Sequence, residues 1–267
     1  SKKFSILNGK TAQLHRALAQ FMLDFHCKKH NYIEFYMPFL VNTKTLYNSG
    51  HLPRFKNDQF KIEKNNLWLS PTSEVQLIAY NKNKTYEEKQ LPLSMVCLST
   101  CFRKEVGNYG KETQGLIRQH QFEKVELVKI CKSTTSYKEL HNVRKNAETV
   151  LKKLKIPYQV KLLDSKNTGF SSSKTYDIEA WLPGTKKYLE VSSCSNTESF
   201  QSLRIKNYWK KKNEKNKYLT HIINGSGLAV GRTLLAILEN YQINNDKIKI
   251  PTALKKYIRD DFITIQK

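Results

Sequence analysis

One stretch of the chain alternates side chains that could bind a ligand. In LIRQHQFEKVELV, residues 116–128, every second position from 118 is charged, polar or aromatic: Arg118, His120, Phe122, Lys124 and Glu126. Side chains two apart in a strand point to the same face. The stretch therefore predicts a strand with one polar face that carries a single ring and a carboxylate, while Val125 and Leu127 point into a core.

The spacing of Phe122 and Glu126 suits an elongated ligand. At the usual rise per residue the two lie about 13 Å apart. A preceding β-like run, about 94–103, ends in Arg103, whose planar guanidinium could meet an anionic group between ring and carboxylate. Ring, guanidinium and carboxylate together fit the base, phosphate and amine of an aminoacyl-adenylate. An ordinary amphipathic hairpin that happens to contain one Phe fits the same pattern.

Three blocks of sequence carry a family resemblance. CFRKEVGNYGKETQGLIRQHQF, residues 101–122, resembles motif 2 of the class II aminoacyl-tRNA synthetases, and with the following KVELV it resembles the seryl-tRNA synthetases in particular. YLEVSSCSN at 188–196 agrees, and NGSGLAVGRTLLAILENYQ at 224–242 resembles motif 3. Three long blocks are more specific than a lone glycine pattern. The resemblance implies an α+β fold, a mixed and mainly antiparallel sheet flanked by helices, and one catalytic domain over residues 1–267.

The resemblance also implies an activity and its residues. The chain would activate L-serine with ATP to seryl-adenylate and transfer the seryl group to tRNA(Ser). The implied catalytic residues are Arg103, Glu190 and Arg232. The implied ATP-binding residues are Arg103, Lys104, Glu105, Gln119, Phe122, Glu190, Val191, Ser192, Ser193 and Arg232. L-serine would lie against Thr72, Ser73, Glu74, Arg103, Glu126 and Ser226.

Individual roles follow from the same resemblance. Phe122 would stack on the adenine, and Glu105 would accept a hydrogen bond from its amino group. Arg103 would bind the α-phosphate, and Arg232 the departing pyrophosphate. Magnesium is implied at two oxygen donors, Glu190 and Ser193. From the residues alone, a solvated strand carboxylate at Glu190 and a capped helix start at 72–74 remain open.

Hydrophobic periodicity and turn residues divide the chain into short elements. Helices are expected at 11–29, 43–50, 72–80, 136–154, 228–241 and 253–260. Strands are expected at 4–7, 31–40, 60–63, 67–70, 94–103, 116–128, 160–163, 175–182, 188–193 and 218–223. Ser70 would cap the helix that Pro71 opens, residues 82–89 would form a solvated turn, and Asn224–Gly227 would form a tight bend.

Composition indicates a cytoplasmic protein with a polyanionic partner. The net charge is +23, although a general preference for Lys also produces it. No apolar run is long enough for a membrane span or a signal segment. The cysteines, at 27, 97, 101, 131 and 194, form no Cys-x-x-Cys pair, which indicates reduced thiols and no zinc. His26 and His30 could form a metal pair, but we interpret them as surface residues of a helix.

Partners and alternatives complete the expectations. The unit 11–40, with Pro38, resembles motif 1 and implies a homodimer. The basic segment 206–217 either contacts RNA or forms a solvated loop. Seryl-tRNA synthetases usually carry an N-terminal coiled coil, and this chain has no sustained heptads. That arm is therefore expected to have been removed or never present, which leaves tRNA charging open.

Two other functions fit an armless chain of this kind. One is aminoacylation of a carrier protein, which would call for Cys and Glu zinc ligands in the pocket. The other is binding of nucleotide or RNA alone, in which case one of Arg103, Arg232 or Glu190 should be missing, and all three are present.

Overall fold

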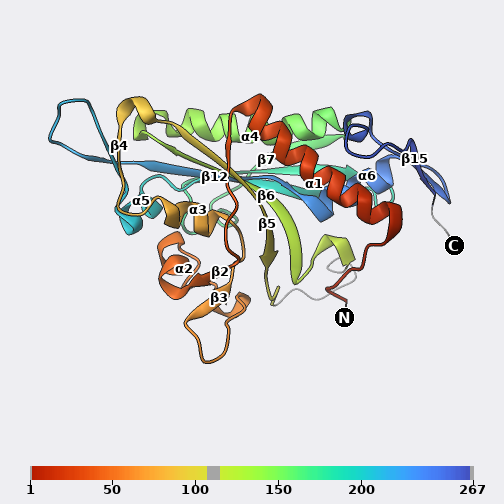
Figure 1. Ribbon diagram of the computed structural model, residues 1–267, viewed down its shortest axis with the longest axis horizontal. Coiled ribbons are helices and arrows are strands. Elements are labelled where there is room, and N and C mark those ends of the chain that lie inside the picture. Colours follow the sequence, from red (N-terminus) through yellow and green to blue (C-terminus); the bar gives the residue numbers. More distant parts are fainter. Residues whose placement is uncertain (1, 107–114, 265–267) are drawn as a thin grey trace.

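The computed structural model describes residues 2–106 and 115–264 and is built around one seven-stranded sheet (Figure 1). Its strands are β1 Ile33–Glu34, β5 Leu93–Phe102, β6 Gln121–Cys131, β7 Tyr158–Leu162, β8 Lys174–Leu182, β9 Lys187–Asn196 and β12 His221–Ala229. They lie in the order β1-β5-β6-β12-β9-β8-β7. β1 is parallel to β5, and the other neighbours are antiparallel. The predicted α+β class with a mixed, mainly antiparallel sheet is confirmed.

Three helices pack against one face of this sheet: α1 (Gly9–His30), α4 (Ser136–Lys153) and α6 (Val230–Asn240). In α1, apolar side chains recur at helical spacing, and Leu14 and Leu18 are fully buried. The side chains of β6 alternate, so Val125 and Leu127 point into the same core as the helices. This core fixes the inner face of the sheet.

Two shorter helices cover only one end of the opposite face. They are α3 (Glu74–Tyr80) and α5 (Phe200–Ile205), and they enclose a second apolar cluster that includes Val128 and Ile130 of β6. Lys124 and Glu126 precede these two residues on the same face, since they also occupy even positions. The remainder of this face is left for a ligand site.

Smaller elements surround the sheet. Two strands, β2 and β3, pair beside the helix α2, and two three-stranded sheets have the orders β11-β10-β4 and β13-β14-β15. Their bounds are β2 Leu40–Asn42, α2 Thr43–Ser49, β3 Leu67–Leu69, β4 Thr85–Glu87, β10 Tyr208–Lys210, β11 Tyr218–Leu219, β13 Gln242–Asn244, β14 Lys247–Lys249 and β15 Phe262–Thr264. Short 3₁₀ helices are η1 Lys56–Asp58, η2 Glu88–Gln90, η4 Gly115–Ile117, η5 Ser133–Thr135 and η6 Thr252–Leu254.

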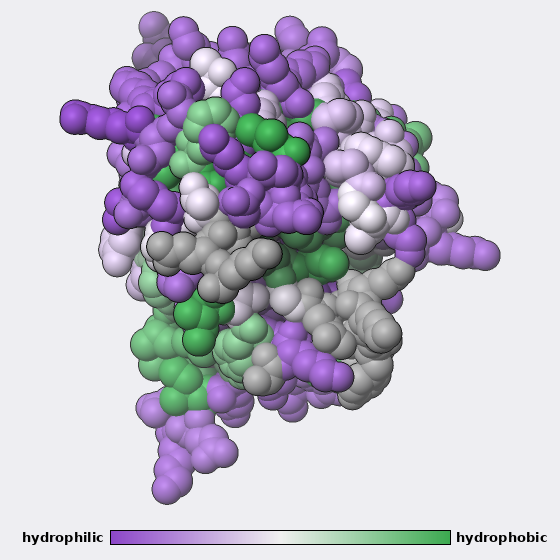
Figure 2. All heavy atoms as spheres, turned by 90° about the vertical axis from the view of Figure 1, so that its right-hand side faces the viewer, coloured by the Kyte–Doolittle hydropathy of each residue, from purple (hydrophilic) through white to green (hydrophobic). Residues whose placement is uncertain are grey.

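The surface agrees with the basic composition. Hydrophilic residues dominate the upper part of the face shown in Figure 2, and hydrophobic residues form small separate areas there. Within residues 2–106 and 115–264, the helices are too short or too polar to cross a bilayer.

Most predicted elements are confirmed, but three expectations near the site are wrong. The strand expected from Leu116 begins at Gln121 and runs on to Cys131, because residues 115–117 form a 3₁₀ turn that starts at a glycine with φ +59°. The tight bend expected at 224–227 is part of the continuous strand β12. The helix expected from residue 72 begins at Glu74. Ser70 does not cap this helix, and its hydroxyl donates to the backbone oxygen of Thr72 instead.

Other expectations are wrong at the periphery. Residues 82–89 contain β4 and a 3₁₀ turn, the C-terminal helix expected at 253–260 is only the turn η6, and residues 4–7 form no strand. In the run 31–40, only Ile33 and Glu34 (β1) and Leu40, the first residue of β2, belong to strand ladders. The run 60–63 contains a single bridge, between Lys61 and Trp68. The segment 206–217 is not simply a loop, since it contains β10.

His26 is the clearest misassignment. We expected a surface residue, but His26 is fully buried, and its Nε2 lies 2.8 Å from the carbonyl oxygen of Gly227 in β12. Its Nδ1 lies 3.1 Å from Nδ1 of His30. The partner of His26 lies 201 residues away along the chain, so local periodicity could not reveal it.

Candidate active site

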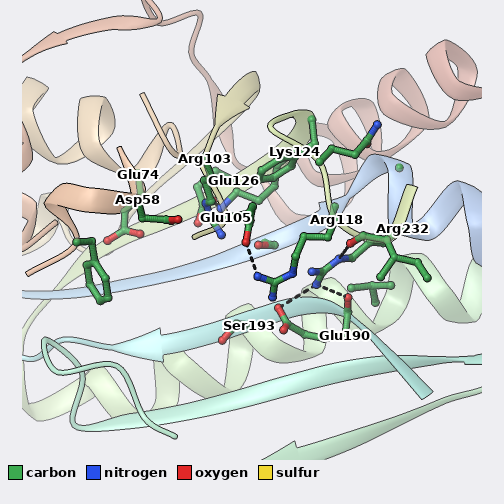
Figure 3. A pocket seen from close by; sticks show the side chains of 18 of the residues that line it. Asp58, Glu74, Arg103, Glu105, Arg118, Lys124, Glu126, Glu190, Ser193 and Arg232 are labelled. Atoms are coloured by element: carbon green, nitrogen blue, oxygen red, sulfur yellow. Dashed lines mark hydrogen bonds and ion pairs between the residues drawn. The ribbon is translucent and has the colours of Figure 1, made fainter. Parts of the chain in front are cut away.

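A cavity of about 630 Å³ opens on the face of the sheet that α1, α4 and α6 leave free (Figure 3). This volume suits a small-molecule ligand. The described residues that line it are Arg54, Phe55, Asn57, Asp58, Glu74, Arg103, Glu105, Val106, Leu116, Ile117, Arg118, Gln119, Phe122, Lys124, Glu126, Glu190, Val191, Ser193, Ser195, Asn224, Ser226, Ala229, Gly231 and Arg232.

Strand β6 provides the axis of the cavity. Phe122, Lys124 and Glu126 follow one another on its open face, as the alternation predicts. Across the ladder to β12, Ser226 stands directly opposite Glu126, and Ala229 stands opposite Lys124. One end of the cavity is therefore aromatic, and the other holds a carboxylate facing a hydroxyl.

The carboxylate end contains a buried ion pair. Nζ of Lys124 contacts Oε2 of Glu126, and their side chains are 9% and 2% exposed. Oγ1 of Thr72 donates to the same carboxylate oxygen at 2.9 Å. Because a buried carboxylate must be paired and hydrogen-bonded, these contacts satisfy Glu126 and fix its orientation.

A second carboxylate, Glu74, faces the same end. Its Oε1 accepts hydrogen bonds from Nε2 of Gln201 at 2.8 Å and from Nδ2 of Asn224 at 3.2 Å. Burial, and then the nearby charge of Glu126, raise the pKa of Glu74 to about 7. Two carboxylates and one lysine at a closed end attract a cationic group, which would favour the ionised form of Glu74.

The opposite end combines a ring with guanidinium groups. The guanidinium carbon of Arg103 lies 5.3 Å from the ring centroid of Phe122, and its Nε donates to the backbone oxygen of Pro71 at 3.3 Å. Glu105 has a left-handed backbone, φ +52°, and pairs with Arg118. The backbone oxygen of Glu105 accepts a hydrogen bond from Nζ of Lys3 at 2.6 Å. These contacts place the Arg103 guanidinium beside the ring of Phe122 and pair Arg118 with Glu105 in the same cavity.

Arg232 is held between β9 and the segment before β6. Its Nε donates to the backbone oxygen of Ile117 at 2.9 Å, and its Nη1 donates to that of Glu190 at 2.8 Å. Nη1 also lies 3.5 Å from the carboxylate of Glu190. Figure 3 marks this ion pair with a dashed line. Arg232 thus faces the cavity with its orientation set by two carbonyl groups.

Oxygen donors for a cation lie beside Arg232. The Glu190 side chain is 47% exposed and lines the cavity together with Ser193. Asp177 pairs with Ser193 across the β8–β9 ladder, and burial raises the pKa of Asp177 to about 6. Carboxylate and hydroxyl oxygens are the hard ligands that Mg²⁺ prefers, so this donor set fits Mg²⁺.

Comparison with known sequences identifies the fold family. The family model described as tRNA synthetase class II core domain (G, H, P, S and T) matches residues 55–241. The chain belongs to this family. The predicted resemblance to class II synthetases is thereby confirmed, and the cavity of this core domain is formed largely by the matched residues.

Relatives of this class II core are similar over almost the whole chain. The serine–tRNA ligase of Phytoplasma mali is 53% identical over 264 residues, which are 98% of this chain and 62% of the relative. The seryl-tRNA synthetase structure of Pyrococcus horikoshii, solved with ATP, has a TM-score of 0.95 and 33% identity, covering 100% of this chain and 59% of that one. The cytoplasmic serine–tRNA ligase of Naegleria fowleri with AMP gives 0.93 and 31%, covering 99% and 63%. The chain spans less than two thirds of each relative.

Most site residues predicted from the sequence line the one cavity. These are Glu74, Arg103, Glu105, Gln119, Phe122, Glu126, Glu190, Val191, Ser193, Ser226 and Arg232. Their roles toward a ligand stay predictions.

The four other predicted residues do not line the cavity. Thr72 and Ser73 are buried, and Thr72 supports Glu126. Oγ of Ser192 donates to the backbone oxygen of Ser226 at 2.6 Å, so its side chain faces the neighbouring strand. Nζ of Lys104 lies 5.7 Å from the ring of Phe60, outside the cavity. His120, expected on the polar face, precedes the start of β6 and packs against Phe4 at a tilted angle and against Phe60 edge-on.

Several lining residues had no predicted role. Lys124 lies in the alternating stretch 116–128, and Asn224 lies in the block that resembles motif 3. Both could therefore have been predicted as site residues from the sequence. Arg54 and Asp58 belong to the loop between α2 and β3, which shows no periodic pattern. The scarcity of Arg in a Lys-rich chain is the one signal that could have singled out Arg54.

Proposed function

We propose that this chain is the catalytic part of a serine–tRNA ligase, which activates L-serine with ATP to seryl-adenylate and transfers the seryl group to the 3′ end of tRNA(Ser). The observation that carries the proposal is that Phe122, Arg103 and Glu126 line one cavity together with Arg232. The similarity to serine–tRNA ligases supports the choice of serine within the class II family.

The ligand lies along β6 in this proposal. Phe122 stacks on the adenine, with Arg103 beside it at the α-phosphate. Glu105, oriented by Arg118, accepts a hydrogen bond from the adenine amino group, and Gln119 lines the same part of the cavity. The ammonium group of serine binds at Glu126 and the hydroxyl at Ser226 and Glu74. A pocket built to hydrogen-bond a hydroxyl discriminates against alanine, because its polar groups would otherwise be left unpaired.

The first step is an in-line displacement. A carboxylate oxygen of serine attacks the α-phosphorus, the bond to the β-phosphate oxygen breaks, and pyrophosphate leaves. Arg103 stabilises the charge that develops on the α-phosphate, and Arg232 holds the departing pyrophosphate, so catalysis depends on positioning and charge. In the second step a hydroxyl of the terminal ribose of tRNA attacks the seryl carbonyl carbon, and AMP leaves.

Glu190 and Ser193 are the residues that would hold Mg²⁺. The ion supplies charge neutralisation of the phosphates when it is bound. Among the residues that the structure describes, no group of three or more His, Cys, Asp or Glu could hold a metal alone. Mg²⁺ needs only one or two protein ligands when phosphates and water complete its coordination.

A homodimer in the cytoplasm completes the proposal. Three apolar residues of the segment that resembles motif 1 are exposed: Ile33 on the edge strand β1 (60%), Tyr36 (87%) and Leu40 (46%). Exposed apolar side chains in one region support an interface there. The cysteines are free, and those at 97, 101, 131 and 194 are buried, which supports a reducing compartment.

Serine-dependent exchange of radioactive pyrophosphate into ATP tests the function. We expect exchange with serine, and much less with threonine, alanine or glycine. If another amino acid supported exchange as well as serine does, the assignment of serine as the substrate would be wrong. Nucleotide binding without any exchange would contradict the enzyme assignment, and acylation of a carrier protein in place of tRNA would contradict the acceptor.

A further inference from the structure

The strand β12 contains a β-bulge beside the cavity: its register with β6 shifts between Ser226 and Ala229. Ser226 pairs with Glu126 and Ala229 pairs with Lys124, so β12 has one more residue than β6 over this interval. Such a bulge re-aims side chains. As a result Ser226 and Ala229 both line the cavity although they are three apart, while Leu228 is fully buried in the core.

The backbone of this bulge is supported by side chains. The ladder between β12 and β9 ends at Gly225, so the next carbonyl groups need other donors. Oγ of Ser192 donates to the Ser226 carbonyl at 2.6 Å, and Nε2 of His26 lies 2.8 Å from the Gly227 carbonyl. A Cβ on Gly227 would lie 2.6 Å from His26 Nε2, so the ring is in direct contact with the bulge.

The protonation of His26 follows from its surroundings. Burial lowers the pKa of His26 to about 3, so the ring is neutral and carries one N–H group. A carbonyl oxygen only accepts, which places that hydrogen on Nε2. Nδ1 of His26 is then an acceptor, and Nδ1 of His30 donates to it at 3.1 Å. Helix α1 therefore holds β12 through a directed hydrogen bond as well as through packing.

We propose that His26 is a positioning residue for the serine end of the site. Its hydrogen bond to the Gly227 carbonyl fixes the bulge that directly follows Ser226, and so holds in place the end of the regular ladder in which Ser226 stands opposite Glu126. The assignment of serine to this end rests on the proposed function. A histidine that only filled the core would not need an N–H group aimed at a strand carbonyl, and a Leu of similar reach would serve.

The test compares two substitutions at this position. His26→Leu removes the donor, and His26→Gln keeps an amide N–H group at the same number of bonds from the backbone. We expect His26→Leu to raise KM for serine about 10-fold, as for a buried acceptor left unpaired, with KM for ATP nearly unchanged. His26→Gln should restore most of the serine affinity. Leu14→Val, in the same helix and also fully buried, controls for lost packing and should lower Tm without changing either KM.

Crystal structures of the wild type and of His26→Leu report the bulge independently of activity. We expect the Gly227 carbonyl and Ser226 to move relative to Glu126, and an unmoved bulge overturns the inference. Equal changes in KM for serine and ATP also overturn it. If the wild type shows no serine-dependent exchange, the proposed function fails, and the crystal structures alone decide the role of His26. If His26→Leu does not fold, Gly227→Ala displaces the same ring and has the same expected outcome.

Discussion

Nζ of Lys124 contacts Oε2 of Glu126, two positions further along the same face of β6, and both side chains are almost completely buried. The pair lies at the closed end of the cavity, where Glu74 adds a second carboxylate. A lysine of this kind neutralises Glu126 before a ligand arrives. In the proposed function the ammonium group of serine would share the carboxylate with Lys124, and the desolvation of Glu126 is already part of the folding energy.

Replacing Glu126 by Gln should weaken serine binding. The substitution keeps the size of the side chain but removes the charge that attracts the ammonium group. Since hydrogen bonds to charged groups contribute about 1.5–3 kcal/mol, we expect KM for serine to rise about 10- to 100-fold in pyrophosphate exchange. KM for ATP should change little.

The chain contains a matched control on the other face of β6. Lys129 and Glu139 form an ion pair of 2.7 Å, and each side chain is 9% exposed. Glu126→Gln and Glu139→Gln each leave a buried lysine unpaired. We expect each to lower the free energy of unfolding by about 3 kcal/mol. An equal increase in KM for serine in Glu139→Gln would show that Glu126 acts only through stability.

Arg103→Ala should lower kcat for adenylate formation. Arg103 lies in the cavity beside Phe122, where charge develops on the α-phosphate in the proposed reaction. By analogy with lost oxyanion donors, we expect a decrease of about 100- to 1000-fold in pyrophosphate exchange. Arg204→Ala is the control, since Arg204 contacts Phe200 in α5 and does not line the cavity. Near-normal exchange in Arg103→Ala would contradict the assignment.

Glu74 predicts a pH dependence of stability. Its pKa in the folded chain, about 7, is above the ordinary value of 4.5, so the folded state binds the proton more tightly than the unfolded state. The free energy of unfolding therefore decreases as pH rises from about 4.5 to about 7, by at most about 1.4 kcal/mol per pH unit from this group, and is constant above that range. Denaturant unfolding at several pH values measures it.

Glu74→Gln should remove this part of the pH dependence, because Gln does not titrate. Glu179→Gln is the control: Glu179 lies on β8, and its carboxylate accepts a hydrogen bond from Gln159 at the surface. Parallel pH profiles for the wild type and Glu74→Gln would mean that Glu74 is ionised in the free protein.

The parts of the fold and of the cavity that depend on local sequence patterns could be predicted from the sequence. The period of two along β6 placed Phe122 and Glu126 on one face, and the strands expected at 175–182 and 188–193 correspond to β8 and β9. Both depend on residues close together in the chain, and the fold adds only the partner strand. Hydrophobic periodicity likewise predicted helices at 11–29 and 136–154, which correspond to α1 and α4.

The wrong predictions at 224–227 and at His26 arise because these residues make contacts with residues far away in the sequence. Asn-Gly-Ser-Gly at 224–227 is typical of a turn, yet a Cβ on Gly225 would lie 2.8 Å from both Cys194 and Val143. Glycine is present there because β12 packs closely on its neighbours, and the strand continues. His26 is polar because a carbonyl of the same strand needs a donor. Neither contact is visible in a window of local sequence.

Tyr36→Asp should dissociate the proposed homodimer. Tyr36 is 87% exposed in the segment after β1, and burying an unpaired carboxylate in an apolar interface is costly. Sedimentation velocity should show a dimer for the wild type and a monomer for the variant. Ile243→Asp is the control, because Ile243 is also exposed, at 56%, but lies on β13. Dissociation by Ile243→Asp alone would place the interface at the C-terminal sheet, and the β1 edge would then be free for another partner.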